Sequence, residues 1–252
     1  MEPEIVAPIV LVCLAVVVIV YTQVIGPRRN RRAVAAVLGR EGWFPVGPGE
    51  APGWPAVMEL AVDRAEGRER DVEYDERTGP FTSHVRRREQ RAGKALEIYR
   101  DGGATAARYA AVAVLEERTS TRTAMRHDSH NYASREIWIG EARELPVRAP
   151  TAAFRATAEL FRQAAIPMAR ARERDPEEVP IIASPPDDRL VERVRAAVME
   201  TPTAVSILAD VYLGPNAWVL VAPLVKAAPR IEEVLALARQ ISAVLDRRPP
   251  EC

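Results

Sequence analysis

The apolar positions of the chain are concentrated in one long run near its beginning. Residues Ile5 to Ile25 carry no side chain that is charged at neutral pH, and Cys13 is their one thiol. A helix of that length, at ~1.5 Å of rise per residue, reaches about 31 Å, which matches the hydrocarbon core of a bilayer. The run therefore predicts one transmembrane helix.

The charges on either side of this run predict its orientation. Glu2 and Glu4 precede it, whereas arginines follow it directly. Basic residues are retained on the cytoplasmic side of a membrane, so we expect the N-terminus outside and the remaining chain in the cytoplasm, at the inner cell membrane. The lipid bilayer is then a partner, and we expect four arginines to contact its surface. They are Arg28, Arg29, Arg31 and Arg32.

A cleaved secretory signal peptide is the alternative interpretation, and it would place the whole domain outside. Such a peptide has a basic N-terminal region and an apolar stretch of about 7 to 15 residues. Here the region before the run is acidic and the run is longer. The retained anchor is therefore the favoured interpretation.

Residues 28–57 are expected to connect the anchor (residues 1–27) to the domain. Arg28 to Arg40 places apolar residues on one helical face and predicts an amphipathic helix. Gly42 to Val57 contains four glycines and four prolines, which predicts a semi-extended spacer. The aromatic residues of this spacer, Trp43, Phe44 and Trp54, are expected to pack against the domain rather than bind a peptide.

The rest of the chain predicts an α+β fold with mostly antiparallel strands, divided into residues 58–178, residues 179–248 and a short tail, 249–252. Asp101-Gly102-Gly103 and Gly214-Pro215-Asn216 each lie between two strand-like segments, as in β-hairpins. Residues 151–166 and the stripe that begins at Ile231 have helical periodicity. Hairpins mixed with helices, without strict β-α-β alternation, indicate this fold class.

Residues 116–135 are polar and predict a loop, which contains the cluster that most resembles a chemical site. His127 and His130 are three residues apart and could bind a transition metal with Asp128. No apolar pattern around them predicts the rigid surroundings that metal sites need. We therefore expect no metal site here and leave the catalytic residues unassigned.

Other polar residues have a simpler explanation. Alternation along residues 205–213 places Asp210 on the solvent side of its strand. Asp187 and Asp188 are typical of a helix start. His84 has no partner that the sequence identifies.

The composition excludes several classes of function. The chain has 35 basic and 35 acidic residues, without the basic excess of a nucleic-acid-binding protein. Cys13 lies in the apolar run and Cys252 is the last residue, so we expect no disulfide between them. Two cysteines are also too few for a Cys-rich metal site. Phosphate-loop, dinucleotide-binding, nucleophile-elbow and HExxH motifs are absent, so we expect no cofactor.

The overall pattern resembles single-pass membrane proteins of high-GC bacteria whose cytoplasmic domains have no assigned activity. The features that carry this resemblance are the acidic N-terminus, the apolar run, the Arg-rich junction, a Gly-Trp pair near the start of the domain, the hairpins and a closing helix rich in Leu and Ala. The scarcity of lysine resembles the coding bias of a high-GC bacterium. Together these features predict a membrane-anchored, non-enzymatic interaction or scaffold domain with a protein partner. The alternative is a membrane-bound metal-dependent or hydrolytic enzyme that uses the His127/His130 loop.

Overall fold

An eight-stranded antiparallel sheet forms the centre of the computed structural model, which describes residues 3–64, 66–78, 81–103, 107–123, 126–163 and 189–247. The strand order is β1-β3-β4-β5-β8-β7-β6, and β2 also pairs with β3. The strands are β1 (Trp43–Val46), β2 (Glu69–Thr78), β3 (Phe81–Asp101), β4 (Arg108–Arg122), β5 (His127–Ala142), β6 (Thr151–Arg155), β7 (Asp210–Gly214) and β8 (Ala217–Pro223).

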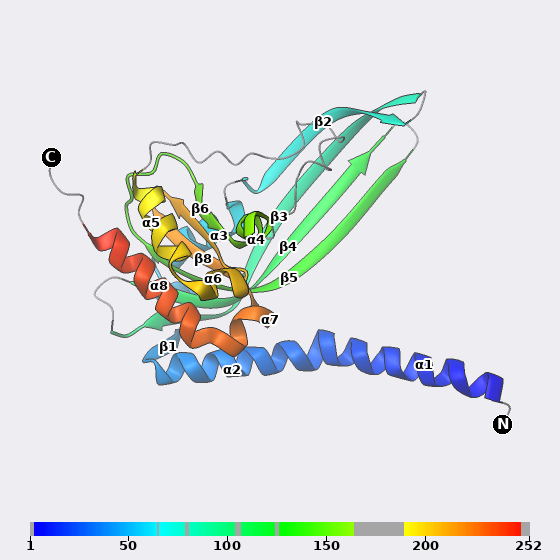
Figure 1. The fold of residues 1–252 in the computed structure, drawn as a ribbon, viewed down its shortest axis with the longest axis horizontal. Helices are drawn as coiled ribbons and strands as arrows, with labels where there is room; N and C mark the ends of the chain where they lie inside the picture. Colours follow the sequence, from blue (N-terminus) through cyan, green and yellow to red (C-terminus); the bar gives the residue numbers. More distant parts are fainter. Residues whose placement is uncertain are drawn as a thin grey trace.

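Helices precede the sheet, connect its strands and cover both of its faces (Figure 1). The α-helices are α1 (Pro3–Val20), α2 (Gly26–Arg40), α3 (Trp54–Asp63), α4 (Ala156–Gln163), α5 (Arg189–Met199), α6 (Pro202–Ser206), α7 (Leu224–Ala227) and α8 (Ile231–Asp246). A π-helical turn, η1 (Tyr21–Ile25), and two 3-10 turns, η2 (Pro48–Glu50) and η4 (Ala228–Arg230), complete the described elements.

Two apolar cores lie on opposite faces of the sheet. Helix α3 packs on one face, where it buries Trp54 and Val57 against Trp138. Helices α2, α5, α7 and α8 pack on the other face, which receives the neighbouring Ile137 and Ile139 of β5. Successive strand residues point to opposite faces, so the buried part of the sheet is apolar at almost every position. The predicted α+β class with antiparallel pairing is confirmed.

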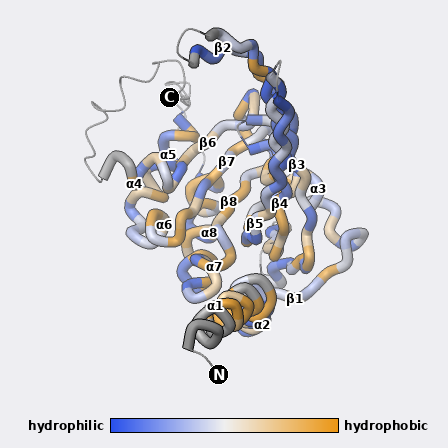
Figure 2. Tube along the Cα trace, turned by 90° about the vertical axis from the view of Figure 1, so that its right-hand side faces the viewer, coloured by the Kyte–Doolittle hydropathy of each residue, from blue (hydrophilic) through white to orange (hydrophobic). Residues whose placement is uncertain are grey.

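Strands β3, β4 and β5 continue well beyond these cores and form, with β2, a projecting arm (Figure 1). On β4 the apolar run ends at Leu115 and a polar run begins at Glu116. On β5 the change falls between Arg135, which is exposed, and Glu136, which is buried. Figure 2 shows hydrophilic residues along these distal strands. We define the arm as β2 with residues 81–91, 116–122 and 127–135.

The expected transmembrane helix over residues 5–25 is wrong. The apolar run is divided between the 18-residue helix α1 and the π-helical turn η1, and α2 follows directly. Within the described ranges, no helix is both long and apolar enough to cross a membrane. The predicted single-pass localisation, with the N-terminus outside and the domain in the cytoplasm, depended on that helix and is not supported.

The glycine- and proline-rich segment does not separate two parts of the molecule. It forms β1, η2 and the start of α3, and it buries Trp43 and Trp54 in the two cores. Only Phe44, of its three aromatic residues, is exposed. Pro45 is accommodated because β1 pairs with β3 alone, so the missing N–H faces away from the ladder. The expected packing of the tryptophans against the domain is therefore confirmed.

Other expectations for local structure have mixed outcomes. The two predicted hairpins are present as β3–β4 and β7–β8, and the predicted stripe of the last helix is buried in α8. The helix expected over residues 151–166 begins only at Ala156, because Thr151–Arg155 pairs with β7 as β6. The loop expected over residues 116–135 is wrong, since β4 and β5 pair along this stretch. Asp187 and Asp188 lie outside the described residues.

The regions 58–178 and 179–248 share the same sheet. Strand β5 of the first region pairs with β8 of the second from Glu136 to Ala142. Strand β6 of the first region pairs with β7 of the second. The two regions therefore bury their apolar residues together.

We predict that Gly93→Ala destabilises the protein. A Cβ atom at Gly93 would lie 2.6 Å from Cη2 of Trp138 and would also collide with Val62, so the core on the α3 face must shift. Overpacking of this kind costs about 1–3 kcal/mol. Chemical denaturation followed by circular dichroism measures the change.

The matched control is Gly39→Ala in α2, where nothing lies within 4 Å of the added Cβ. This substitution is expected to leave the free energy of unfolding unchanged or raise it by up to about 1 kcal/mol. Equal effects of the two substitutions would contradict the tight packing described for Gly93.

Candidate functional site

A buried ion pair joins the end of α3 to the point where β5 leaves the core. Arg64 follows α3 with φ of +48°, and its Nη2 donates hydrogen bonds to both carboxylate oxygens of Glu136 at 2.7 Å. Glu136 also accepts hydrogen bonds from Ser134 Oγ and Trp138 Nε1, at 3.0 and 2.7 Å. Burial opposes the positive charge of Arg64, but the attraction of Glu136 prevails and raises the pKa of the guanidinium. The backbone strain at Arg64 is therefore held in place by a fully hydrogen-bonded carboxylate.

A second group of charges is centred on Glu66, next to this pair. Its carboxylate accepts a hydrogen bond from Arg91 Nη2 at 2.5 Å and one from Arg155 Nη1 at 3.1 Å. Arg91 Nε donates in turn to Glu117 at 2.9 Å. Burial alone would raise the pKa of Glu66, but the hydrogen bonds and charges of Arg91 and Arg155 outweigh it and lower that pKa. These residues connect the arm strands β3 and β4 to β6.

Asp210 belongs to the same charged group, and the expectation that it faces solvent is wrong. Its carboxylate accepts a hydrogen bond from the backbone N–H of Ala156 at 2.9 Å and from the hydroxyl of Tyr212 at 3.2 Å. Arg155 faces it across the β6–β7 pair, 3.9 Å away. Burial raises the pKa of Asp210 despite these partners. The sequence does not predict the burial of Asp210, because β6, which pairs with β7 beside it, comes from a distant part of the chain.

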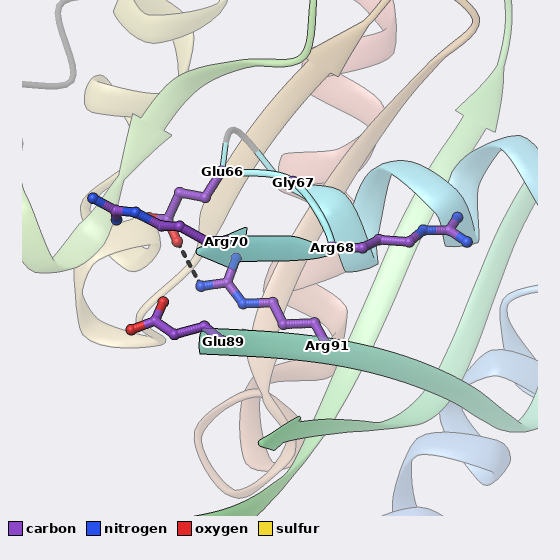
Figure 3. A pocket seen from close by; sticks show the side chains of 6 residues that line it. All are labelled: Glu66, Gly67, Arg68, Arg70, Glu89 and Arg91. Atoms are coloured by element: carbon purple, nitrogen blue, oxygen red, sulfur yellow. Dashed lines mark hydrogen bonds and ion pairs between the residues drawn. The ribbon is translucent and has the colours of Figure 1, made fainter. Parts of the chain in front are cut away.

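A small hollow opens at the base of the arm beside Glu66 (Figure 3). It is lined by Glu66, Gly67, Arg68, Arg70, Glu89 and Arg91. Arg91 points to Glu66 in this view, whereas Arg68 points away from that pair and forms an ion pair with Asp63. The empty volume of about 170 Å³ includes open solvent, so the hollow encloses far less space than the ~300–1,000 Å³ of small-molecule sites. The hollow therefore fits an anchoring role for the arm better than a substrate site.

The arm carries a ladder of opposite charges between β2 and β3. From Glu69 to Asp75, acidic residues occupy every second position of β2, and all of them except Glu69 lie opposite a basic residue of β3. Arg86 Nη2 lies 2.5 Å from Asp71, and this hydrogen bond lowers the pKa of the carboxyl. Exposed pairs contribute little one by one, but a network orders the strands that carry it. The members are Glu69, Asp71, Glu73 and Asp75 with His84, Arg86 and Arg88.

The two histidines of the predicted metal candidate lie in strand β5, not in a loop. His127 and His130 are three residues apart in a strand, so their side chains point to opposite faces of the arm. Asp128 forms an ion pair with Arg126 at 2.7 Å. In the part of the chain that the structure describes, no group of three or more His, Cys, Asp or Glu residues could hold a metal ion.

The arginines expected at a membrane surface lie at the start of α2. Arg28, Arg29 and Arg32 are exposed. Arg31 turns toward the sheet and forms an ion pair of 3.1 Å with Glu97 of β3. Contact of these residues with lipid stays a prediction. Large apolar side chains from Leu11 to Ile25 are also exposed where the structure describes them, with 67% of Leu11 accessible.

The edge strand β6 is covered, whereas β5 has one side without a paired strand in the arm. At β6, helix α5 packs alongside and Arg195 Nε donates a hydrogen bond to the backbone oxygen of Ala153 at 3.1 Å. At β5, pairing with β8 begins only at Glu136. Among the described residues, no strand pairs with the outer edge of β5 from His127 to Arg135.

Comparison with known proteins found no matching family model, no matching curated protein and no matching solved structure.

We predict that Glu66→Gln destabilises the protein at pH 7 and that the effect disappears in acid. The amide forms weaker hydrogen bonds with Arg91 and Arg155, which costs about 1–3 kcal/mol of unfolding free energy. Because the pKa of Glu66 is lowered in the folded state, its contribution is complete above the ordinary value of 4.5 and is lost as the pH falls through the folded-state value.

Denaturation of both proteins between pH 7 and about pH 3 measures this difference. Comparison with wild type removes the opposite contribution of Asp210, whose raised pKa makes stability fall as the pH rises. The control is Glu76→Gln, at an exposed position of β2. A difference for Glu66→Gln that stays constant over this pH range would contradict the assigned role.

Proposed function

We propose that this chain is a non-enzymatic interaction module and that the arm is its protein-binding element. The observation that carries this proposal is the continuation of β3, β4 and β5 beyond the two apolar cores (Figure 1). The protein partner foreseen from the sequence would then bind away from the helices.

The energetics of the arm favour binding. Ordering each residue costs about 1–2 kcal/mol of conformational entropy, which globular domains offset by burying apolar side chains. Most side chains of the arm are exposed, and its strands are polar at positions on both faces. The arm therefore contributes little to the core, and a binding role accounts for its length.

The attachment of the arm also favours binding, because a rigid element loses less entropy when it associates. Glu66 and Arg91 link the root of the arm to Arg155 of β6. The Arg64–Glu136 pair fixes β5 at the same level. The charge ladder then orders β2 against β3 as far as Asp75 and His84.

The enzymatic alternative has weaker support. It relied on a loop that brings His127 and His130 together, and these residues point to opposite faces of β5. The hollow beside Glu66 is lined by arginine and glutamate side chains, of which Arg91 and Glu66 form an ion pair, and it is small for a substrate.

Site-specific photo-crosslinking in cells tests the proposal. Benzoylphenylalanine replaces Tyr132 on the arm or, as a control, Val225 on α7; their exposed fractions are 64% and 66%. We expect a discrete covalent adduct with a protein from Tyr132 and none from Val225. Adducts from Val225 alone, or from neither position, would contradict a binding role for the arm.

A further inference from the structure

We propose that the partner of the arm is a second copy of this chain, and that the outer edges of the two β5 strands pair antiparallel about a two-fold axis. This inference rests on the proposed binding role of the arm and names its partner. The paired segment is residues 127–135.

The backbone of this segment supplies the docking groups. Along a strand, the N–H and C=O groups of alternate residues point to the same edge. Strand β4 occupies one edge of β5 over its whole length, whereas β8 occupies the other only from Glu136 to Ala142. The hydrogen-bonding groups of the outer edge between His127 and Arg135 therefore have no strand partner among the described residues. An added strand would continue the ladder on this edge.

The two edges of the arm, β2 and the outer segment of β5, differ in how strongly their charges prevent pairing with another chain. Seven of the ten residues of β2 are charged, with a net charge of −3, and charge on an edge strand prevents pairing with other chains. The outer segment of β5 contains one acidic and one basic residue, Asp128 and Arg135, between Ser, Asn, Ala, Tyr and His. Its edge is therefore the one suited to association.

The sequence of the segment is compatible with itself. In an antiparallel pair, two residues that face each other point their N–H and C=O groups either both toward the partner strand or both away from it. In a symmetric pair, the two-fold axis therefore lies midway between one residue and its own copy. Complete overlap of residues 127–135 places Asn131 opposite its own copy and His130 opposite Tyr132. Asp128 then faces Ser134, so no two carboxylates are opposed. Self-pairing of β2 would instead place Glu73 opposite itself and Asp71 opposite Asp75, which is unfavourable.

The geometry also explains why association would stop at two copies. Pairing of the two β5 edges is isologous, so each copy uses its open edge once. The arms then form one continuous sheet whose outermost strands are the two charged β2 strands. A second copy is therefore a better occupant than an unrelated extended peptide, because it satisfies both β5 edges and leaves only the charged β2 edges at the outside of the joined arms.

Sedimentation of the full-length chain tests this arrangement. Asn131→Lys places two like charges opposite each other at the axis, and we expect it to weaken the dimer by about tenfold or more in Kd. The control is Thr121→Lys, which adds the same charge to β4, a strand paired on both sides in the arm. This control should leave the Kd of the dimer within about twofold of wild type.

Disulfide trapping supplies a direct test of register. In a chain with Cys13→Ser and Cys252→Ser, Asn131→Cys is expected to form an intermolecular disulfide rapidly, since opposed Cα atoms are about 4.5–5.5 Å apart in antiparallel pairs. Thr121→Cys, which faces Asp128 of its own β5, is expected to stay reduced.

The outcomes separate this inference from the proposed function. A dimer whose Kd is unchanged by Asn131→Lys, or a chain that stays monomeric, would overturn the pairing of β5 with a second copy. If adducts at Tyr132 then contain a different protein, the arm remains a binding element with another partner. If Tyr132 forms no adduct either, both proposals fail.

Discussion

The ion pair between Arg64 and Glu136 lies where the sheet changes from a buried structure into an exposed one. A buried carboxylate must have a counter-charge and hydrogen bonds, and Glu136 receives both from Arg64, Ser134 and Trp138. The same contacts fix the indole of Trp138, which stacks on Trp54 of α3 with ring centroids 6.3 Å apart. Removal of one partner of such a pair costs about 3–5 kcal/mol, because the other charge stays buried. The packing of α3, the position of β5 and the direction of the arm therefore depend on one interaction.

On either side of this pair the sheet is stabilised by different forces. In the core, Ile137 and Trp138 point to opposite faces and each face is covered by helices, so apolar burial dominates. In the arm, backbone hydrogen bonds and a network of charges such as Asp71–Arg86 replace it. The charged cluster around Glu66 joins the two parts, since Arg91 belongs to the arm and Arg155 to the core. A rigid core with an ordered polar extension is a suitable architecture for a protein that binds through its strands.

The sequence predicted those elements whose pattern is local. The stripe of α8, the Gly214-Pro215-Asn216 turn and the antiparallel α+β class depend on neighbouring residues, and each is present. The arm was missed because Glu116 to Arg122 is polar on both faces and has no alternation, although its threonines favour strands. The apolar run of residues 5–25 predicts one helix, which the π-helical turn after Val20 divides.

The candidate site could not be predicted from the sequence, because its residues are far apart along the chain. Glu66, Arg91, Arg155 and Asp210 come from four separate parts of the chain, and only the sheet order brings them together. Long-range pairings such as β6 with β7 leave no local signal, so Asp210 was expected to face solvent. The open edge of β5 also depends on a distant element, because it is defined by the residue at which β8 ends.

The arm is an ordered part of the sheet, and hydrogen exchange of the full-length chain measures this order directly. We expect slow exchange for the amides of β4 between Glu116 and Arg122, since both edges of that strand are paired. In the outer segment of β5, protection should alternate from residue to residue when the chain is dilute. Exchange of all these amides at the rate of an unfolded chain, while β8 stays protected, would contradict the account.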